Sequence, residues 1–268
     1  MMKKKLICLV VIIMLFCTGC TKSGDQKIVG TDTGITTRFE NALELQKNVF
    51  IGRIESVSTE NALITKYNLD ITSYTVYVVD ITQSIDGYTP LGQAKIYCVG
   101  TTEYFLSRIN MKKGEQYIIE AQPWVYGDEI IYLLSIYTTA YPRIDTAGMV
   151  TLAQNEQEAL SCGSLEEYLA EYDKARSAVE AKNPDFFAPE NILERFGAYV
   201  AEIYEKNTAA DAYSQDKGYQ WLPDSEFIAK TSENSRQLYD RYTELESIEQ
   251  VTQQQVSEFI ISVLGGKF

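Results

Sequence analysis

The sequence predicts an α+β fold, in which a small barrel of five or six strands is followed by a helical C-terminal region. Short segments rich in β-branched and aromatic residues recur between residues 49 and 152, and glycine-containing turns separate them. From Ser164 onward the apolar residues have a helical spacing instead, and two helix capping boxes appear. A run of strands followed by a run of helices is typical of α+β proteins or of two separate domains.

The β-rich part begins with a predicted short helix at 37–47, because Phe39 and Leu43 share a helical spacing after Thr37, a suitable cap residue. Gly52 lies inside the first predicted strand, where a glycine often marks a bulge or the close approach of another segment. The strands are expected at 49–57, 73–81, 94–99, 116–121, 130–137 and 149–152.

Four helices are expected after the strands. Ser164 with Glu167, and Thr252 with Gln255, have the spacing of capping boxes, in which side chains satisfy the first backbone donors of a helix. Asn183-Pro184 stops the first of these helices. The helices are expected at 164–182, 189–206, 224–245 and 252–264.

The first twenty residues have the parts of a secretory signal peptide. Three lysines at positions 3–5 precede an uncharged apolar run at 6–16, and the small residues Thr18 and Gly19 lead to Cys20. The apolar run is too short for a permanent membrane span, which takes about 20 residues. The sequence therefore predicts export.

The segment Thr18-Gly19-Cys20 resembles the lipobox of bacterial lipoproteins, in which small residues precede a cysteine that becomes linked to diacylglycerol. The family usually has leucine where this chain has Cys17. The resemblance implies a signal peptide at 1–19, lipidation of Cys20 and a lipidated tether at 20–36. It also implies a protein held by lipid at the extracytoplasmic face of the cell membrane. An ordinary signal peptide and an uncleaved anchor are the alternatives.

Composition excludes several classes of function. The net charge is −13, and cleavage before Cys20 would make it more negative by removing three lysines. Nucleic acid and anionic lipid head groups repel such a chain, so nucleic acid is not expected as a partner. The chain has no histidine, which excludes Ser-His-Asp and Cys-His hydrolases of the usual kind and histidine-bound zinc.

The order of the strands resembles the oligonucleotide/oligosaccharide-binding (OB) barrel of netrin-like domains, which tissue inhibitors of metalloproteinases share. The segments 49–54, 74–81 and 114–119 carry the resemblance. It implies an OB-like barrel domain at 37–155, of a kind that occurs on lipoproteins of Gram-positive bacteria. The α-helical region at 160–268 resembles no family. The inhibitors act through an N-terminal cysteine with a free amine, which a lipidated Cys20 cannot supply, so protease inhibition does not follow.

No motif identifies a catalytic residue, a metal site or a cofactor, and we expect none. The segment from Ser214 to Lys217 has the SxxK spacing of penicillin-recognising enzymes, but it lies in a predicted loop and lacks the partner motifs. The 37 acidic residues do not single out the two carboxylates that a glycosidase needs, and they are interpreted as solvated surface.

Five residues remain as candidates for a binding site or a disulfide. Tyr74, Tyr77 and Tyr97 lie on the second and third predicted strands, where OB barrels bind ligands, so these tyrosines are one hypothesis for a ligand-binding face. Filling the barrel core is the alternative. Cys98 and Cys162 could form a disulfide, because exported proteins allow one, and two separate thiols are the alternative.

These observations favour a membrane-anchored surface lipoprotein that is not an enzyme and that binds a protein or another ligand. The expected partners are the membrane, through the anchor, and another envelope protein or a cell-wall ligand. The alternative function is a cell-envelope hydrolase, or a carbohydrate- or peptide-binding receptor, that uses carboxylates and tyrosines.

Overall fold

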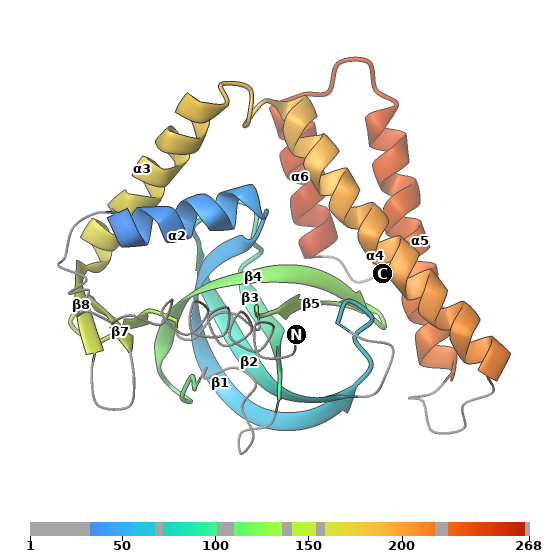
Figure 1. Cartoon of the computed structure of the whole chain (residues 1–268), viewed down its shortest axis with the longest axis horizontal. Helices are drawn as coiled ribbons and strands as arrows, with labels where there is room; N and C mark the ends of the chain where they lie inside the picture. Colours follow the sequence, from blue (N-terminus) through green and yellow to red (C-terminus); the bar gives the residue numbers. More distant parts are fainter. Residues whose placement is uncertain are drawn as a thin grey trace, which may run out of the picture. The chain divides into compact units, whose positions relative to one another are not determined.

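Five strands form a closed ring of hydrogen-bonded neighbours in the first half of the chain (Figure 1). The computed structural model describes residues 33–67, 72–100, 110–135, 141–153, 159–217 and 225–265. The ring strands are β1 (Asn48–Ala62), β2 (Thr72–Ser84), β3 (Gly92–Val99), β4 (Gln116–Tyr126) and β5 (Glu129–Leu133). They are neighbours in the order β1-β2-β3-β5-β4, and β4 pairs again with β1. Only β3 and β5 are parallel among these ring pairs.

Three shorter strands extend the same sheet beyond the ring. They follow β4 in sheet order, each antiparallel to its neighbour: β6 (Arg143–Ile144), β7 (Met149–Ala153) and β8 (Ala159–Ser164). The sequence predicts β7 but misses β6 and β8. The first has only two residues, and the second consists mainly of small residues, so neither has the β-branched and aromatic pattern of a strand.

Five helices are described, one before the strands and four after them: α2 (Thr33–Glu44), α3 (Leu165–Lys182), α4 (Pro189–Lys217), α5 (Ser225–Glu246) and α6 (Gln253–Leu264). Both predicted capping boxes are confirmed, at Ser164 and at Thr252. The α+β class predicted from the sequence is therefore confirmed.

Two helices differ from the prediction in their bounds. Helix α2 begins at Thr33, so Thr37 lies inside the helix and is not its cap, and the end of the predicted tether is helical. Helix α4 continues beyond residue 206 to Lys217, so the SxxK segment is helical and not a loop. Alanines at 209, 210 and 212 favour this extension, since alanine has the strongest intrinsic helix preference, and α4 packs along α5.

Gly52 is confirmed as the site of a bulge and of a close approach. The pairing of β1 with β2 shifts register between Ile51 and Gly52. A Cβ atom on Gly52 would collide with the side chain of Val79 on β2. The glycine therefore lets β1 bend while it pairs with β2 on one side and with β4 on the other.

Side chains that alternate along the ring strands fill separate hydrophobic cores. The ring core collects residues from all five ring strands and consists of Phe50, Ile54, Tyr77, Val79, Ile81, Ile96, Cys98, Met111, Tyr117, Ile119, Ala121, Tyr132, Leu134 and Tyr141. The helix core joins the opposite faces of the same strands, including Tyr74, Val76, Tyr97, Trp124 and Leu133, to α4, α5 and α6. Since one core spans strands and helices, these helices hold a fixed position against the ring.

A third core holds α2 and α3 against β1 and β4. It contains Phe39, Ala42, Val49, Ile51, Ile118, Ile144, Val150, Tyr168, Tyr172 and Ala175. Arg38 of α2 also forms an ion pair with the buried Glu120 of β4. Within the described residues, no helix has both the length and the apolar composition needed to cross a membrane.

Candidate functional site

A cleft lies where α2, α3, α4 and α6 meet the start of β1 and the turn after β2. Its volume is about 100 Å³. It is lined by Leu43, Gln46, Lys47, Asn48, Asp86, Tyr88, Pro123, Tyr172, Arg176, Phe186, Phe187, Ile192, Arg195, Phe196, Tyr199, Ile260 and Leu264. The lining combines an apolar floor with three cationic side chains, and this combination makes the cleft the strongest candidate for a binding site.

The apolar floor comes from helices that the hydrophobic cores hold in place. Ile192 and Phe196 of α4 and Ile260 and Leu264 of α6 belong to the helix core, and each is less than a tenth exposed. Tyr172 of α3 is similarly buried in the third core. Because the floor is made of core residues, its shape is set by folding and exists before any ligand arrives.

Two arginines stand on the cleft wall, each over a phenylalanine ring. The Arg195 guanidinium lies 3.7 Å from the centre of the Phe186 ring and donates to the Phe186 carbonyl at 2.7 Å. The Arg176 guanidinium lies 4.6 Å from the centre of the Phe187 ring. The two rings pack edge to face, with centres 5.0 Å apart. The loop between α3 and α4 thereby fixes the direction of both cations.

The cations of the cleft have no ion-pair partner within the described part of the chain. No described carboxylate lies within ion-pair distance of Lys47, Arg176 or Arg195. Burial lowers the pKa of the Arg195 guanidinium, although the neighbouring charge of Glu194 opposes the shift. A partly desolvated, unneutralised cation gains more from an incoming anion than a fully hydrated one.

Asp86 is the one carboxylate among the described residues that line the cleft, and its oxygens are already used. Asp86 Oδ2 accepts hydrogen bonds from Asn48 Nδ2 and the Val49 backbone N–H, both at 2.9 Å. Asp86 Oδ1 accepts from Ser84 Oγ at 2.8 Å and from the Thr89 N–H at 2.9 Å. Asp86 therefore organises the turn after β2 and ties it to the start of β1.

A half-buried lysine lies behind the cleft wall. The Lys66 ammonium donates to Gln122 Oε1 at 2.6 Å and lies 5.3 Å and 5.0 Å from the ring centres of Trp124 and Tyr199. Burial lowers its pKa, while the charge of Glu202 raises it. Tyr199 also donates its hydroxyl hydrogen to the Pro123 carbonyl, which fixes the ring between Lys66 and the cleft.

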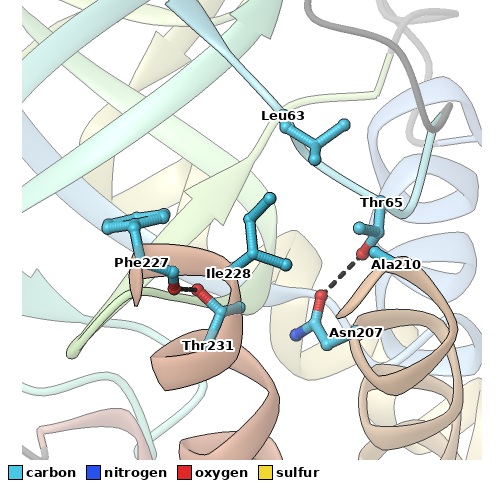
Figure 2. A pocket seen from close by; sticks show the side chains of 7 residues that line it. All are labelled: Leu63, Thr65, Asn207, Ala210, Phe227, Ile228 and Thr231. Carbon is cyan, nitrogen blue, oxygen red and sulfur yellow. Dashed lines mark hydrogen bonds between the residues drawn. The ribbon is translucent and has the colours of Figure 1, made fainter. Parts of the chain in front are cut away.

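A second, smaller hollow lies at the seam between the segment after β1 and helices α4 and α5 (Figure 2). Its volume is about 10 Å³, roughly the space that a single water molecule occupies. Asn207 accepts a hydrogen bond from Thr65 there at 2.6 Å, and its amide donates to Ser235 Oγ at 2.8 Å. This polar network joins the segment after β1 to α4 and α5, and the small size of the hollow suits a structural role.

The three tyrosines predicted from the sequence do not share one face. Tyr74 and Tyr97 contact each other with ring centres 5.9 Å apart in the helix core, whereas Tyr77 points into the ring core. Their exposed fractions are 0%, 2% and 2% for Tyr74, Tyr77 and Tyr97. Such burial agrees with the alternative interpretation, in which these tyrosines fill the core.

The other candidate residues are separated or lie outside the described residues. The structure places Cys98 in the ring core and Cys162 beside the third core, and the two sulfurs are not bonded to each other. Burial raises the pKa of the Cys162 thiol. Cys20 and the signal peptide lie outside the described residues. No group of three acidic or cysteine side chains suited to a metal ion occurs in the described residues.

Sequence reasoning missed the cleft because its lining comes from six segments that are distant in the chain. One feature could have pointed to it. Phe186-Phe187 follows the helix-stopping Asn183-Pro184 in a short loop between two predicted helices, and adjacent phenylalanines in a short loop are unusual for a solvated connection.

Comparison with known proteins gives no relative on which to base a function. No protein family, no curated protein and no solved structure matches the chain. Any function therefore has to be argued from the chemistry of the cleft and of the N-terminal sequence.

Proposed function

We propose that the protein is a lipid-anchored, non-enzymatic binding protein at the extracytoplasmic face of the cell membrane, and that the cleft is its ligand-binding site. The anchor is argued from the Thr18-Gly19-Cys20 sequence alone. One observation carries the binding site. Three cations gather at an apolar hollow with no described carboxylate in ion-pair distance, although the chain has a net charge of −13.

The chemistry of the cleft favours a ligand with an anionic group next to a small apolar group. The apolar group would contact the floor at Ile192, Phe196 and Leu264, and the anion would lie between Arg176 and Arg195. Arginine suits this task, because its planar guanidinium can donate two parallel hydrogen bonds to a carboxylate. A hydrogen bond to a charged group contributes about 1.5–3 kcal/mol, which is enough to select an acid over its neutral analogue.

We also propose that the five-stranded ring is an OB-like barrel. The order β1-β2-β3-β5-β4 with closure onto β1, and the parallel pairing of β3 with β5, support this proposal. OB barrels usually bind ligands over strands two and three. Here the outward side chains of β2 and β3, Tyr74, Val76, Tyr97 and Val99, pack against the helices in the helix core. A ligand site at the cleft, away from that covered face, fits this arrangement.

A cysteine substitution tests the anchor. In the producing bacterium, Cys20→Ala is expected to move the protein from the membrane fraction to the medium, because the chain would lose its only lipid-bearing residue. Cys17→Leu is the matched control, and it should leave the protein in the membrane fraction. If the Cys20→Ala protein stays with the membranes in the same amount, lipid anchoring at Cys20 is wrong.

Two small probes test the cleft. Phenylacetate and phenylacetamide have the same shape, but only the first is charged, so we expect phenylacetate to bind at least about tenfold more tightly. Ligand-detected NMR measures both affinities. Arg176→Gln should remove most of this preference, because the anion loses one of its two guanidinium partners. The variant should fold normally, since Arg176 is exposed and its loss does not disturb a core.

Arg236→Gln is the matched control for this experiment. Arg236 lies on α5, does not line the cleft and forms its own ion pairs with Glu233 and Asp240. It should leave the preference for phenylacetate unchanged. Equal binding of the two probes to the wild-type protein, or binding of neither, would contradict the proposed site.

A further inference from the structure

We infer that the occupant of the cleft is a linear segment of a partner protein, in which an apolar side chain lies next to a carboxylate. This inference rests on the proposed function and narrows it from an anionic ligand to a peptide. Three observations lead to it: the volume of the cleft, exposed apolar residues next to its lining residues in the chain, and the charge of the cleft relative to the rest of the protein.

The volume of the cleft fits one side chain and not a whole small molecule. Pockets for drug-sized ligands measure about 300–1,000 Å³, and a cavity of about 150 Å³ accommodates benzene. The cleft measures about 100 Å³. A single leucine-sized group, or a phenyl ring that stays partly in the open mouth, is therefore the largest body that the cleft can take up without opening further. The remainder of the ligand has to lie outside it.

Exposed apolar residues occur next to several lining residues in the chain. Leu45, Leu91 and Ile261 are 56%, 66% and 43% exposed. Leu45 and Ile261 adjoin the lining residues Gln46 and Ile260 in the chain, and Leu91 follows Pro90, which lies beside the end of α6. A linear segment that leaves the cleft can contact apolar surface beyond it, whereas a compact metabolite cannot.

Charge then selects the kind of segment. With a net charge of −13, the chain repels a strongly acidic partner over most of its surface. The cleft has room for one apolar group beside Arg176 and Arg195, so the best-matched segment has one carboxylate there and few acids elsewhere. A flat anionic membrane is a poorer match, because the net charge of −13 opposes the approach of the protein to anionic head groups.

Peptide selection tests the inference. A displayed library of short random peptides is selected on the secreted Cys20→Ala protein, and the enriched sequences are synthesised and measured by fluorescence anisotropy. We expect sequences with Asp or Glu beside Leu, Ile, Met or Phe. Their affinity should fall about tenfold or more with Arg176→Gln, and it should be unchanged with Arg236→Gln. Replacing the acid of the peptide by its amide should cause a similar loss.

Other results overturn the inference. No enrichment, enriched peptides without an acid, or equal binding to the Arg176→Gln protein would each contradict a peptide occupant. Arg176-dependent binding to vesicles that contain phosphatidylglycerol would assign the cleft to a lipid surface. An Arg176-dependent dimer in size-exclusion chromatography would assign it to a second copy of the chain. If phenylacetate binds selectively but no peptide does, the proposed function stands and only this inference fails.

Discussion

Gly127, in the turn between β4 and β5, is the residue on which the seating of α5 depends. Its backbone N–H donates to Thr231 Oγ1 at 2.8 Å, and its carbonyl accepts from Asn234 Nδ2 at 2.7 Å. Its φ of +64° is in the left-handed region that favours glycine. A Cβ atom there would lie 2.5 Å from the Phe227 ring. Two side chains of α5 and one turn thus fix each other.

Gly127→Ala is therefore expected to destabilise the protein more than an alanine at another left-handed glycine. Gly87 is the matched control, because its φ is +79° and nothing lies within 4 Å of an added Cβ. Both variants lose the conformational freedom of glycine, but only Gly127→Ala also displaces Phe227. The difference in free energy of unfolding, from urea titrations, should be about 1–3 kcal/mol. Equal destabilisation would show that Phe227 moves aside without cost.

At the scale of the element, the capping box of α3 is the clearest link between a sequence motif and a measurable property. Ser164 Oγ accepts from the Glu167 N–H at 3.2 Å, and the Glu167 carboxylate accepts from the Ser164 N–H at 2.7 Å. The carboxylate also accepts from the Ser164 hydroxyl at 3.0 Å, and the two bonds from Ser164 lower the pKa of Glu167 below its ordinary value of 4.5. The charged form of Glu167 is thus the form that the folded helix stabilises.

Ser164→Ala should lower the free energy of unfolding by about 1 kcal/mol at neutral pH. A lowered carboxyl pKa stabilises the fold above the ordinary pKa of 4.5, and this stabilisation is lost as the pH falls through the lower folded-state value. The loss of unfolding free energy caused by Ser164→Ala should therefore be smaller in acid than at neutral pH. Urea titrations at neutral and at acidic pH measure this difference. Ser177→Ala, within the same helix, should show no such pH dependence.

The elements with long, regular patterns could be predicted from the sequence, and those without could not. The strands of the ring and all four C-terminal helices appear where β-branched runs, apolar residues at helical spacing and two capping boxes indicate them. β6 and β8 could not be predicted, because they exist through pairing with β4 and β7 and not through their own preference. The sequence prediction also ends α4 too early, at residue 206, although Gly218 directly after Lys217 is a typical residue to follow a helix end.

At the scale of the whole molecule, buried tyrosines make the fold sensitive to alkali. Burial is the main cause that raises the phenol pKa above the ordinary 10.0 in eleven described residues: Tyr67, Tyr74, Tyr77, Tyr97, Tyr117, Tyr126, Tyr132, Tyr168, Tyr172, Tyr199 and Tyr242. For Tyr77 and Tyr242 the pKa is raised to about 12. At a pH above 10.0, the folded state therefore keeps these phenols protonated, whereas the unfolded chain ionises them.

Stability should consequently decline as the pH rises above 10.0, because the unfolded chain then releases protons that the folded chain retains. We expect most of the tyrosinate absorbance to appear in one steep step, together with the loss of the circular dichroism of the helices. A gradual rise in absorbance with the helices intact would mean that the phenols are reached by solvent in the native state.

The candidate site belongs to this largest scale, which explains why the sequence did not indicate it. Lys47, Arg176 and Arg195 are ordinary surface residues by their local context, and only the meeting of α2, α3, α4 and α6 places them together. The sequence indicates Tyr74, Tyr77 and Tyr97 instead, because the pattern of a strand does not show that helices cover the outward face of β2 and β3 or that Tyr77 points into the ring core. The residue pattern of one strand identifies which face is buried, but it does not identify the element that covers this face.

The sharing of one core between β2 and α6 has a consequence for the order of events during biosynthesis. Tyr74 and Val76 are made early, yet Val263 and Leu264, which complete the same core, are added almost two hundred residues later. Contacts so distant along the chain form late and slowly. A nascent chain would expose the hydrophobic outer face of its strands throughout that interval. We therefore expect it to require a chaperone until the last helix has emerged.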